Sequence, residues 1–172
     1  MKTKTLFFVS IAAAAALVSA SCEQTKTTEP TATVSAAEQN KQLMNDYINY
    51  FNNRDWEKLK TLFAANYDYH PQEGIEGPDG LVAFLQPFAN SFDAKVKIED
   101  LVTDGDKVVY RGSVSGKHIA DFQGMPPTNK DVNVSTIGIC RIENGKVVEE
   151  WEVFEEMKMM QQLGAVPAPE TK

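Results

Sequence analysis

Cysteine and histidine are scarce in this chain, which has two of each among its 172 residues. His70 and His118 have no partner at a spacing such as HxxxH, and Cys22 and Cys140 do not form a CxxC pair. Since protein metal sites need several such ligands at short spacings, we expect none here. Cys140 lies in an alternating apolar and polar segment, so we expect it to be a small buried hydrophobe.

Basic residues are also few. The chain has 17 Lys and Arg against 24 Asp and Glu, and its formal net charge at pH 7 is −7. The basic residues form no cluster or stripe that could neutralise phosphates, so we expect no nucleic-acid partner. The same acidity disfavours direct binding to an anionic membrane surface.

No apolar run is long enough to span a bilayer, and the longest, residues 6–18, follows Lys2 and Lys4. This pattern predicts an export signal over residues 1–21. Two processing sites remain open: the small residues 18–20 resemble a signal-peptidase site, and Cys22 stands where a lipoprotein signal is cut and lipidated. We favour lipidation of Cys22, because residues 22–36 form a polar tether with little to bury. The predicted location is the bacterial cell envelope (periplasm or outer membrane), with a secreted soluble protein as the alternative.

The folded domain is predicted over residues 37–165, with a flexible tail at 166–172. Ser35 and Glu38 form a capping box before a first helix, Asp55 precedes a short second helix with Trp56, and Gly77-Pro78 opens a third. We expect Pro87 to kink or end this third helix, because its ring removes a backbone donor. A short extended piece over residues 67–70 lies between the second and third helices.

From residue 95 the apolar period changes to two, which predicts four strands in two antiparallel hairpins. Two turns are open here, Asp104-Gly105 and Gly105-Asp106, and the second better satisfies the side-chain pairs, since it places Val102 opposite Val109 and Asp100 opposite Arg111. Helices followed by strands indicate an α+β fold, with the helices packed on one face of a strongly curved antiparallel sheet around one pocket. Two apolar residues of the irregular loop after the first hairpin, Phe122 and Met125, are expected to pack over that pocket.

The last hairpin turns at Asn144-Gly145, the strongest hairpin signal in the chain. A regular register places Trp151 opposite Gly138, with Glu155 on the same apolar face. The glycine then makes room for the indole. A carboxylate on an apolar face is desolvated, and its pKa rises toward the operating pH, so Glu155 is the best candidate base. A single bulge in this hairpin would turn Glu155 to the other face.

Several segments together resemble the SnoaL-like polyketide or ester cyclase family: GPDG at 77–80, GDKV at 105–108, GKH at 116–118, FQGMPPT at 122–128, RIENGK at 141–146, Trp151 and QLG at 162–164. The resemblance implies an NTF2-like cone around a deep pocket that needs no cofactor, often in a homodimer. It also implies that an acidic residue shortly after the tryptophan moves the proton in an intramolecular aldol closure. Glu155 stands at that position, and His118 keeps its place in the family pattern.

The predicted site therefore has Glu155 as base and His118 as an assisting donor, acting on a small apolar or polycyclic molecule. Tyr110 or Arg111 could add a donor, only one of them facing inward because they are adjacent on a strand. The remaining predicted substrate-binding residues are Trp151, His70, Phe122, Met125 and Trp56. Ordinary roles compete: most glutamates in an acidic run are solvated, tryptophans pack in cores, and histidines beside loops face solvent. Two other functions stay open, a non-catalytic ligand-binding envelope lipoprotein and a different NTF2-like chemistry such as isomerisation or epoxide hydrolysis.

Overall fold

The computed structural model describes residues 35–167, so the predicted export signal and Cys22 lie outside the described residues. The elements follow in the order α1 (Ala36–Asn53), α2 (Trp56–Lys60), β1 (Phe63–Tyr69), α3 (Gly77–Ser91), β2 (Lys95–Asp104), β3 (Lys107–Lys117), β4 (Asp131–Glu143), β5 (Lys146–Phe154) and α4 (Glu156–Leu163). The α+β class is confirmed. No helix between residues 35 and 167 is long and apolar enough to cross a membrane.

The predicted caps of the first two helices are present. The Ser35 hydroxyl accepts a hydrogen bond from the Glu38 N–H at 3.2 Å, and the Asp55 carboxylate accepts one from the Lys58 N–H at 3.4 Å. Arg54 follows α1 in the left-handed conformation. Its guanidinium donates to the carbonyls of Ala89, within α3, and Ala94, which ties the end of α1 to α3 and to the segment after it.

Pro87 does not end α3, which continues to Ser91. Proline has no N–H, so residue 87 cannot make the helical hydrogen bond to the carbonyl of Ala83. Both residues line the cavity described below. The last helix, α4, stops at Gly164 with φ 79°, a left-handed conformation that favours glycine.

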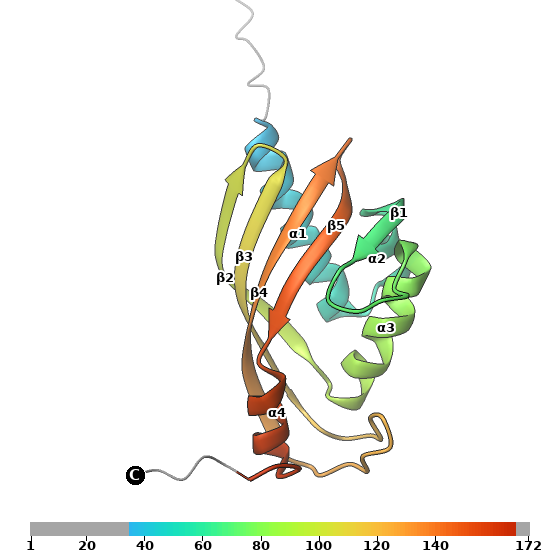
Figure 1. Ribbon diagram of the computed structural model, residues 1–172, viewed down its shortest axis with the longest axis vertical. Helices are drawn as coiled ribbons and strands as arrows, with labels where there is room; N and C mark the ends of the chain where they lie inside the picture. Colours follow the sequence, from blue (N-terminus) through green and yellow to red (C-terminus); the bar gives the residue numbers. More distant parts are fainter. Residues whose placement is uncertain (1–34, 168–172) are drawn as a thin grey trace, which may run out of the picture. The chain divides into compact units, whose positions relative to one another are not determined.

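The strands form one five-stranded sheet in the order β1-β5-β4-β3-β2. Strand β1 runs parallel to β5, a pairing between distant parts of the chain, and the other neighbours are antiparallel. In Figure 1, α1 passes behind the strands and α3 lies beside β1, so one face of the sheet is covered and the other is open. The two predicted pairs of the first hairpin are confirmed, with Val102 opposite Val109 and Asp100 opposite Arg111, and the pairing shifts beyond them, between Ile98 and Asp100.

The predicted register of the last hairpin is wrong beyond its first two pairs. The turn is at Asn144-Gly145 as expected, but the pairing shifts by one residue between Arg141 and Ile142. The shift lets the consecutive residues Val147 and Val148 both be buried, and it pairs Arg141 with Glu149 at 2.7 Å. A bulge of this kind exchanges the two faces of the strand that follows it.

The bulge places Glu150, Glu152 and Phe154 on the covered face of β5, and Trp151 and Val153 on the open face. Gly138 therefore lies opposite Glu152, and it makes room for a ring other than the predicted indole. A Cβ at residue 138 would overlap the ring of Tyr110, so the glycine gives that tyrosine the space to pack against β4.

Candidate functional site

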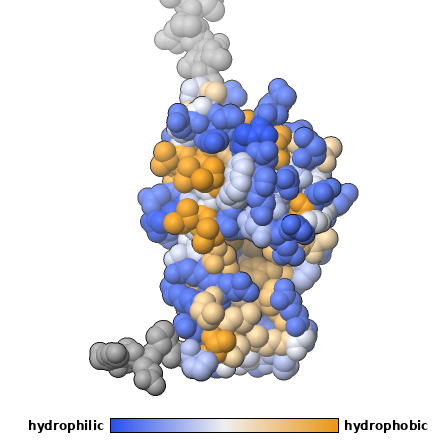
Figure 2. Space-filling view, in the orientation of Figure 1, coloured by the Kyte–Doolittle hydropathy of each residue, from blue (hydrophilic) through white to orange (hydrophobic). Residues whose placement is uncertain are grey.

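A cavity of about 880 Å³ lies against the covered face of the sheet. Its walls come from α1, α3, α4, residues of the sheet, and the loops around residues 71 and 122. Figure 2 shows the surface hollowed between the end of β5 and α3. Most of the lining is apolar and much of it is aromatic, with Tyr47, Tyr69, Phe84, Phe88, Phe122 and Phe154 among its members.

Glu152 is the carboxylate that reaches this cavity from the sheet. It is half-buried, and its two oxygens accept hydrogen bonds from different elements. The Tyr69 hydroxyl, at the end of β1, donates to one oxygen at 2.8 Å, and the Thr136 hydroxyl of β4 donates to the other. Since both donors belong to the sheet, they hold the carboxylate in one orientation toward the cavity.

Glu150 lies on the same face of β5 and is almost completely buried, with 1% of its surface exposed. Its oxygens accept hydrogen bonds from the hydroxyls of Tyr67 at 2.9 Å and Tyr110 at 2.8 Å. Burial, and then the charge of Glu152, raise the pKa of Glu150 to about 7. The ring of Tyr110 lines the cavity, so this tyrosine connects the cavity wall to the buried carboxyl.

The tyrosine hydroxyls around these two carboxyls remain protonated. Burial is the main cause that raises the pKa of Tyr67, Tyr69 and Tyr110, and the nearby glutamates raise it further. A phenol in this setting donates its proton in a hydrogen bond and does not ionise. The site therefore contains two carboxyl groups, two residues apart, each held by protonated hydroxyls.

Glu155, the predicted base, lies outside this arrangement. It is the residue before α4, and its exposed carboxylate accepts hydrogen bonds from the Ser135 N–H at 2.7 Å and from Lys158 at 2.9 Å. These two contacts, the first foremost, lower the pKa of Glu155. The predicted face of Glu155 is wrong, because the bulge turns the strand between the turn and this residue.

His118, the predicted assisting donor, is completely buried but does not line the cavity. Its Nδ1 accepts the Thr128 N–H at 3.2 Å, so the ring proton lies on Nε2, and the ring stacks on Phe92 at 4.7 Å. The backbone of His118 also pairs with Asn129 and Lys130. The contacts of His118 thus hold together the two ends of the loop at 118–130.

The predicted substrate-binding residues are divided between the two sides of the sheet. Tyr110 and Phe122 line the cavity. Arg111 faces outward and pairs with Asp100 at 2.6 Å, while Trp151 is on the open face, stacked on His70 at 4.4 Å. Two more are half-buried beside the core without lining the cavity, Met125 and Trp56.

The sequence interpretation missed Glu150 and Glu152 as inward residues. One signal could have found them, because the regular register sets Glu149 opposite Cys140, whereas a one-residue bulge sets Glu149 opposite Arg141. A glutamate opposite an arginine is a more favourable cross-strand pair than a glutamate opposite a cysteine. Residues 35–167 contain no group of three or more His, Cys, Asp or Glu placed to hold a metal ion.

Comparisons with a family model and with solved structures indicate the same protein family. The family model for SnoaL-like polyketide cyclases matches residues 41–163. TsrD from Streptomyces laurentii is similar in structure, with 28% identity, a TM-score of 0.69, and coverage of 74% of this chain and 96% of TsrD. IdmH from Streptomyces antibioticus, a proposed polyketide cyclase, is 26% identical with a TM-score of 0.65, over 73% of this chain and 99% of IdmH.

AclR from Streptomyces galilaeus, a proposed hydroxylase, shares the fold at 22% identity and a TM-score of 0.70, over 78% of this chain and 87% of AclR. Curated protein sequences contain no match to this chain. The family match covers most of the chain, and the helices and mixed sheet agree with it. The chain belongs to the SnoaL-like polyketide cyclase family and has its NTF2-like fold.

Proposed function

We propose that this chain is a cofactor-independent acid/base catalyst that acts on a small, largely apolar molecule bound in the cavity, with Glu152 as the base. One observation carries the proposal: the Glu152 carboxylate lines an aromatic cavity and is held there by two hydroxyls. A carboxylate fixed at the wall of an apolar cavity is positioned to take a proton from a ligand bound there. Because the Glu155 carboxylate is exposed and bound by Ser135 and Lys158, we assign the role of base to Glu152.

The reaction class that fits the family is an intramolecular aldol closure. Glu152 would take a proton from the carbon next to a carbonyl, and the resulting enolate carbon would attack a second carbonyl carbon of the same molecule. A carbon–carbon bond forms, and the new alkoxide takes the proton back from the Glu152 carboxylic acid. No electrons or protons are gained overall, so the ring closure needs no further reactant.

Glu150 would assist by holding a proton, which lowers the total negative charge of the Glu150–Glu152 pair. Two carboxyls on adjacent inward positions of one strand repel each other when both are ionised. Because burial raises the pKa of Glu150 to about 7, Glu150 can keep its proton near neutral pH, which lowers the negative charge beside the cavity carboxylate. Tyr110 separates Glu150 from the cavity, so Glu150 is a positioning residue in this proposal.

The proposal can be tested without the natural substrate. The probe 5-nitrobenzisoxazole reports a base in an apolar site: the base removes the proton on carbon 3, the N–O bond breaks, and a coloured cyanophenolate forms. We expect the chain to accelerate this reaction and Glu152→Gln to slow it by about 100-fold or more. Glu155→Gln is the matched control, and its rate should stay within about twofold of the unsubstituted chain. Equal rates for the chain and Glu152→Gln would contradict the proposal.

A second candidate is ligand binding without turnover. Both oxygens of Glu152 already accept hydroxyl hydrogen bonds, so neither oxygen is free to take a proton from a ligand without giving up one of these bonds. For this candidate we expect naphthalene-sized molecules to bind while 5-nitrobenzisoxazole reacts no faster than in buffer.

We also propose that the chain is exported and that a lipid on Cys22 anchors it to the cell envelope. The mass of Cys22-containing peptides from native membranes tests this proposal.

We further propose that the chain forms a homodimer through the open face of the sheet. Apolar side chains follow one another across four strands of this face, namely Val102, Val109, Ile139, Trp151, Ile137 and Val153. Figure 2 shows apolar atoms gathered over the strands, with hydrophilic residues around them. Arg111 with Asp100, and Arg141 with Glu149, place both signs of charge beside the apolar rows. A surface of this kind is complementary to a second copy of itself.

A further inference from the structure

The charged side chains that line the cavity are all acidic. Glu152, Asp121 and Glu156 belong to the lining, and no Lys, Arg or His does so anywhere in residues 35–167. Glu152 is half-buried at the sheet, whereas Asp121 and Glu156 are exposed, which places one carboxylate in the wall and two toward solvent. Such an arrangement attracts positive ligands and repels negative ones at the entrance and in the wall.

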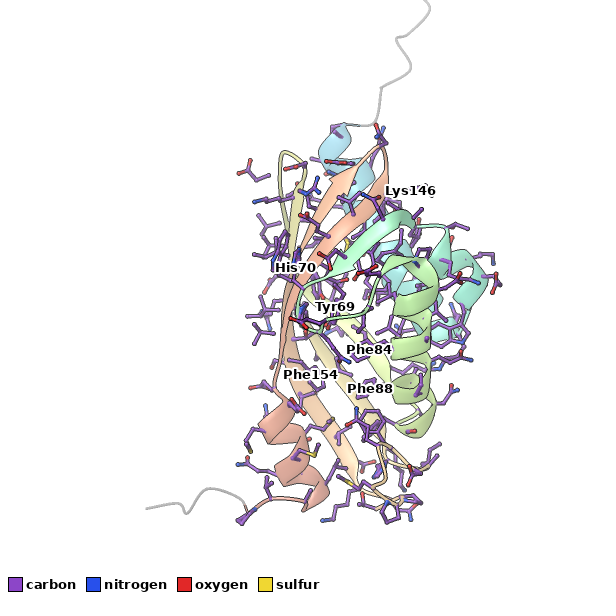
Figure 3. All side chains as sticks on the ribbon, turned by 45° about the vertical axis from the view of Figure 1, so that its right-hand side comes forward. Tyr69, His70, Phe84, Phe88, Lys146 and Phe154 are labelled. Atoms are coloured by element: carbon purple, nitrogen blue, oxygen red, sulfur yellow. The ribbon has the colours of Figure 1, made fainter. Side chains whose placement is uncertain are left out.

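Aromatic rings line the same space. Figure 3 shows Tyr69, Phe84, Phe88 and Phe154 between the sheet and α3. Phe88 meets Phe154 edge to face at 5.9 Å, and Tyr69 lies 5.5 Å from Phe84. Glu152 and Phe154 are two residues apart on one strand face, a spacing of about 6.6 Å along the strand. A ligand of modest size can therefore contact the carboxylate and the rings together.

A ligand that enters with a permanent negative charge would be poorly accommodated here. Removing a negative group from water is costly unless a cation or several donors meet it, and the lining supplies three carboxylates and no cation. A cationic group gains from the carboxylates and also from the negative faces of the aromatic rings. The carboxylates do not group into a metal-binding set within the described residues, so an organic cation suits the cavity better than a metal ion.

We infer that the ligand of this cavity is an organic cation, a tertiary or quaternary ammonium group attached to an apolar ring system. The inference rests on the proposed function in taking this cavity as the ligand site, and it names the class of ligand. The rings enclose the apolar part of the ligand, and Glu152 faces the ammonium group. Ligands whose charge comes from a carboxylate or a phosphate are excluded.

Three probes of similar shape test the inference. They are 2-naphthyltrimethylammonium, its neutral isostere 2-tert-butylnaphthalene, and the anion 2-naphthoate, each followed by naphthalene fluorescence with the unsubstituted chain. We expect the ammonium probe to bind at least about tenfold more tightly than the neutral isostere, and the anion to bind most weakly. Equal affinity for the ammonium and neutral probes would overturn the inference and leave the proposed apolar site intact. Failure of all three probes to bind would overturn both.

Single substitutions then show which side chains cause the preference for the ammonium probe. Phe88→Leu keeps the wall apolar but removes one ring, so the ammonium affinity should fall about fivefold while the neutral affinity stays within about twofold. Phe88→Tyr retains the ring and should restore the ammonium affinity. Glu152→Gln should weaken the ammonium probe alone, and Glu155→Gln should change neither. A parallel loss of both probes in Phe88→Leu and Glu152→Gln would mean that the residues only shape the cavity, and it would overturn the inference.

Discussion

The Glu150 carboxyl is the residue whose environment departs most from that of an ordinary glutamate. It is buried, it accepts two tyrosine hydroxyls, and its pKa is raised to about 7 from an ordinary 4.5. The folded state therefore holds this proton more tightly than the unfolded state does. By linkage, the resulting contribution to stability is fully present below pH 4.5 and is lost as the pH rises toward about 7.

We predict that the free energy of unfolding falls by about 3 kcal/mol as the pH rises from 4.5 to about 7. The reason is that ionising Glu150 in the fold costs free energy that ionising it in the unfolded chain does not. Urea unfolding at several pH values measures this loss. Glu150→Gln should flatten the profile in this window, because an amide does not titrate. The exposed Glu155→Gln should keep the fall, and a Glu150→Gln profile as steep as that of the unsubstituted chain would contradict the assignment.

The two hairpins differ in how far side-chain patterns alone predict the register of their strands. In the first, the apolar pair Val102–Val109 and the charged pair Asp100–Arg111 require the same register, and the prediction was right. In the last, the apolar alternation favoured a regular strand, while burial of Val148 and the Arg141–Glu149 pair required a bulge. A bulge depends on packing against the rest of the sheet, which a local pattern does not contain.

Pro87 provides a prediction for α3. Its ring prevents a helical hydrogen bond to Ala83, and both residues line the cavity. Pro87→Ala should raise the free energy of unfolding by about 1 kcal/mol, because alanine restores the donor and is a better helix former. Urea unfolding measures the change. The neighbouring Gln86 is exposed and has its N–H, so Gln86→Ala should shift stability by less than about 0.5 kcal/mol. Equal effects of the two substitutions would contradict this account of α3.

At the scale of the whole molecule, the α+β class and the family could both be predicted from the sequence. The helix caps and turns are local, and the family segments are distributed along most of the chain. The parallel pairing of β1 with β5 could not be predicted, because it joins residues about eighty positions apart through backbone groups. The wrong predictions for Trp151 and Glu155 both followed from the missing bulge between the turn and these residues.

The proposed homodimer gives a prediction at this scale. Ile137 is 51% exposed on the open face, and Ile119 is 50% exposed in the segment after β3. Ile137→Lys should convert a dimer to a monomer in analytical ultracentrifugation, because a buried charge facing its own copy lacks a partner. Ile119→Lys is the matched control and should leave the dimer unchanged. A chain that is monomeric before substitution, or a dimer that survives Ile137→Lys, would contradict the proposal.

Three glutamates near the end of β5 differ in orientation, because Glu150 and Glu152 face inward and Glu155 does not. Carbon-13 NMR of side-chain carboxyls in glutamate-labelled chain tests this difference most directly, with Glu150→Gln, Glu152→Gln and Glu155→Gln assigning the three signals. We predict that the Glu150 signal titrates near pH 7, that the Glu155 signal titrates below the ordinary range, and that 2-naphthyltrimethylammonium shifts the Glu152 signal without shifting that of Glu155. A ligand-induced shift at Glu155 with none at Glu152 would contradict the account.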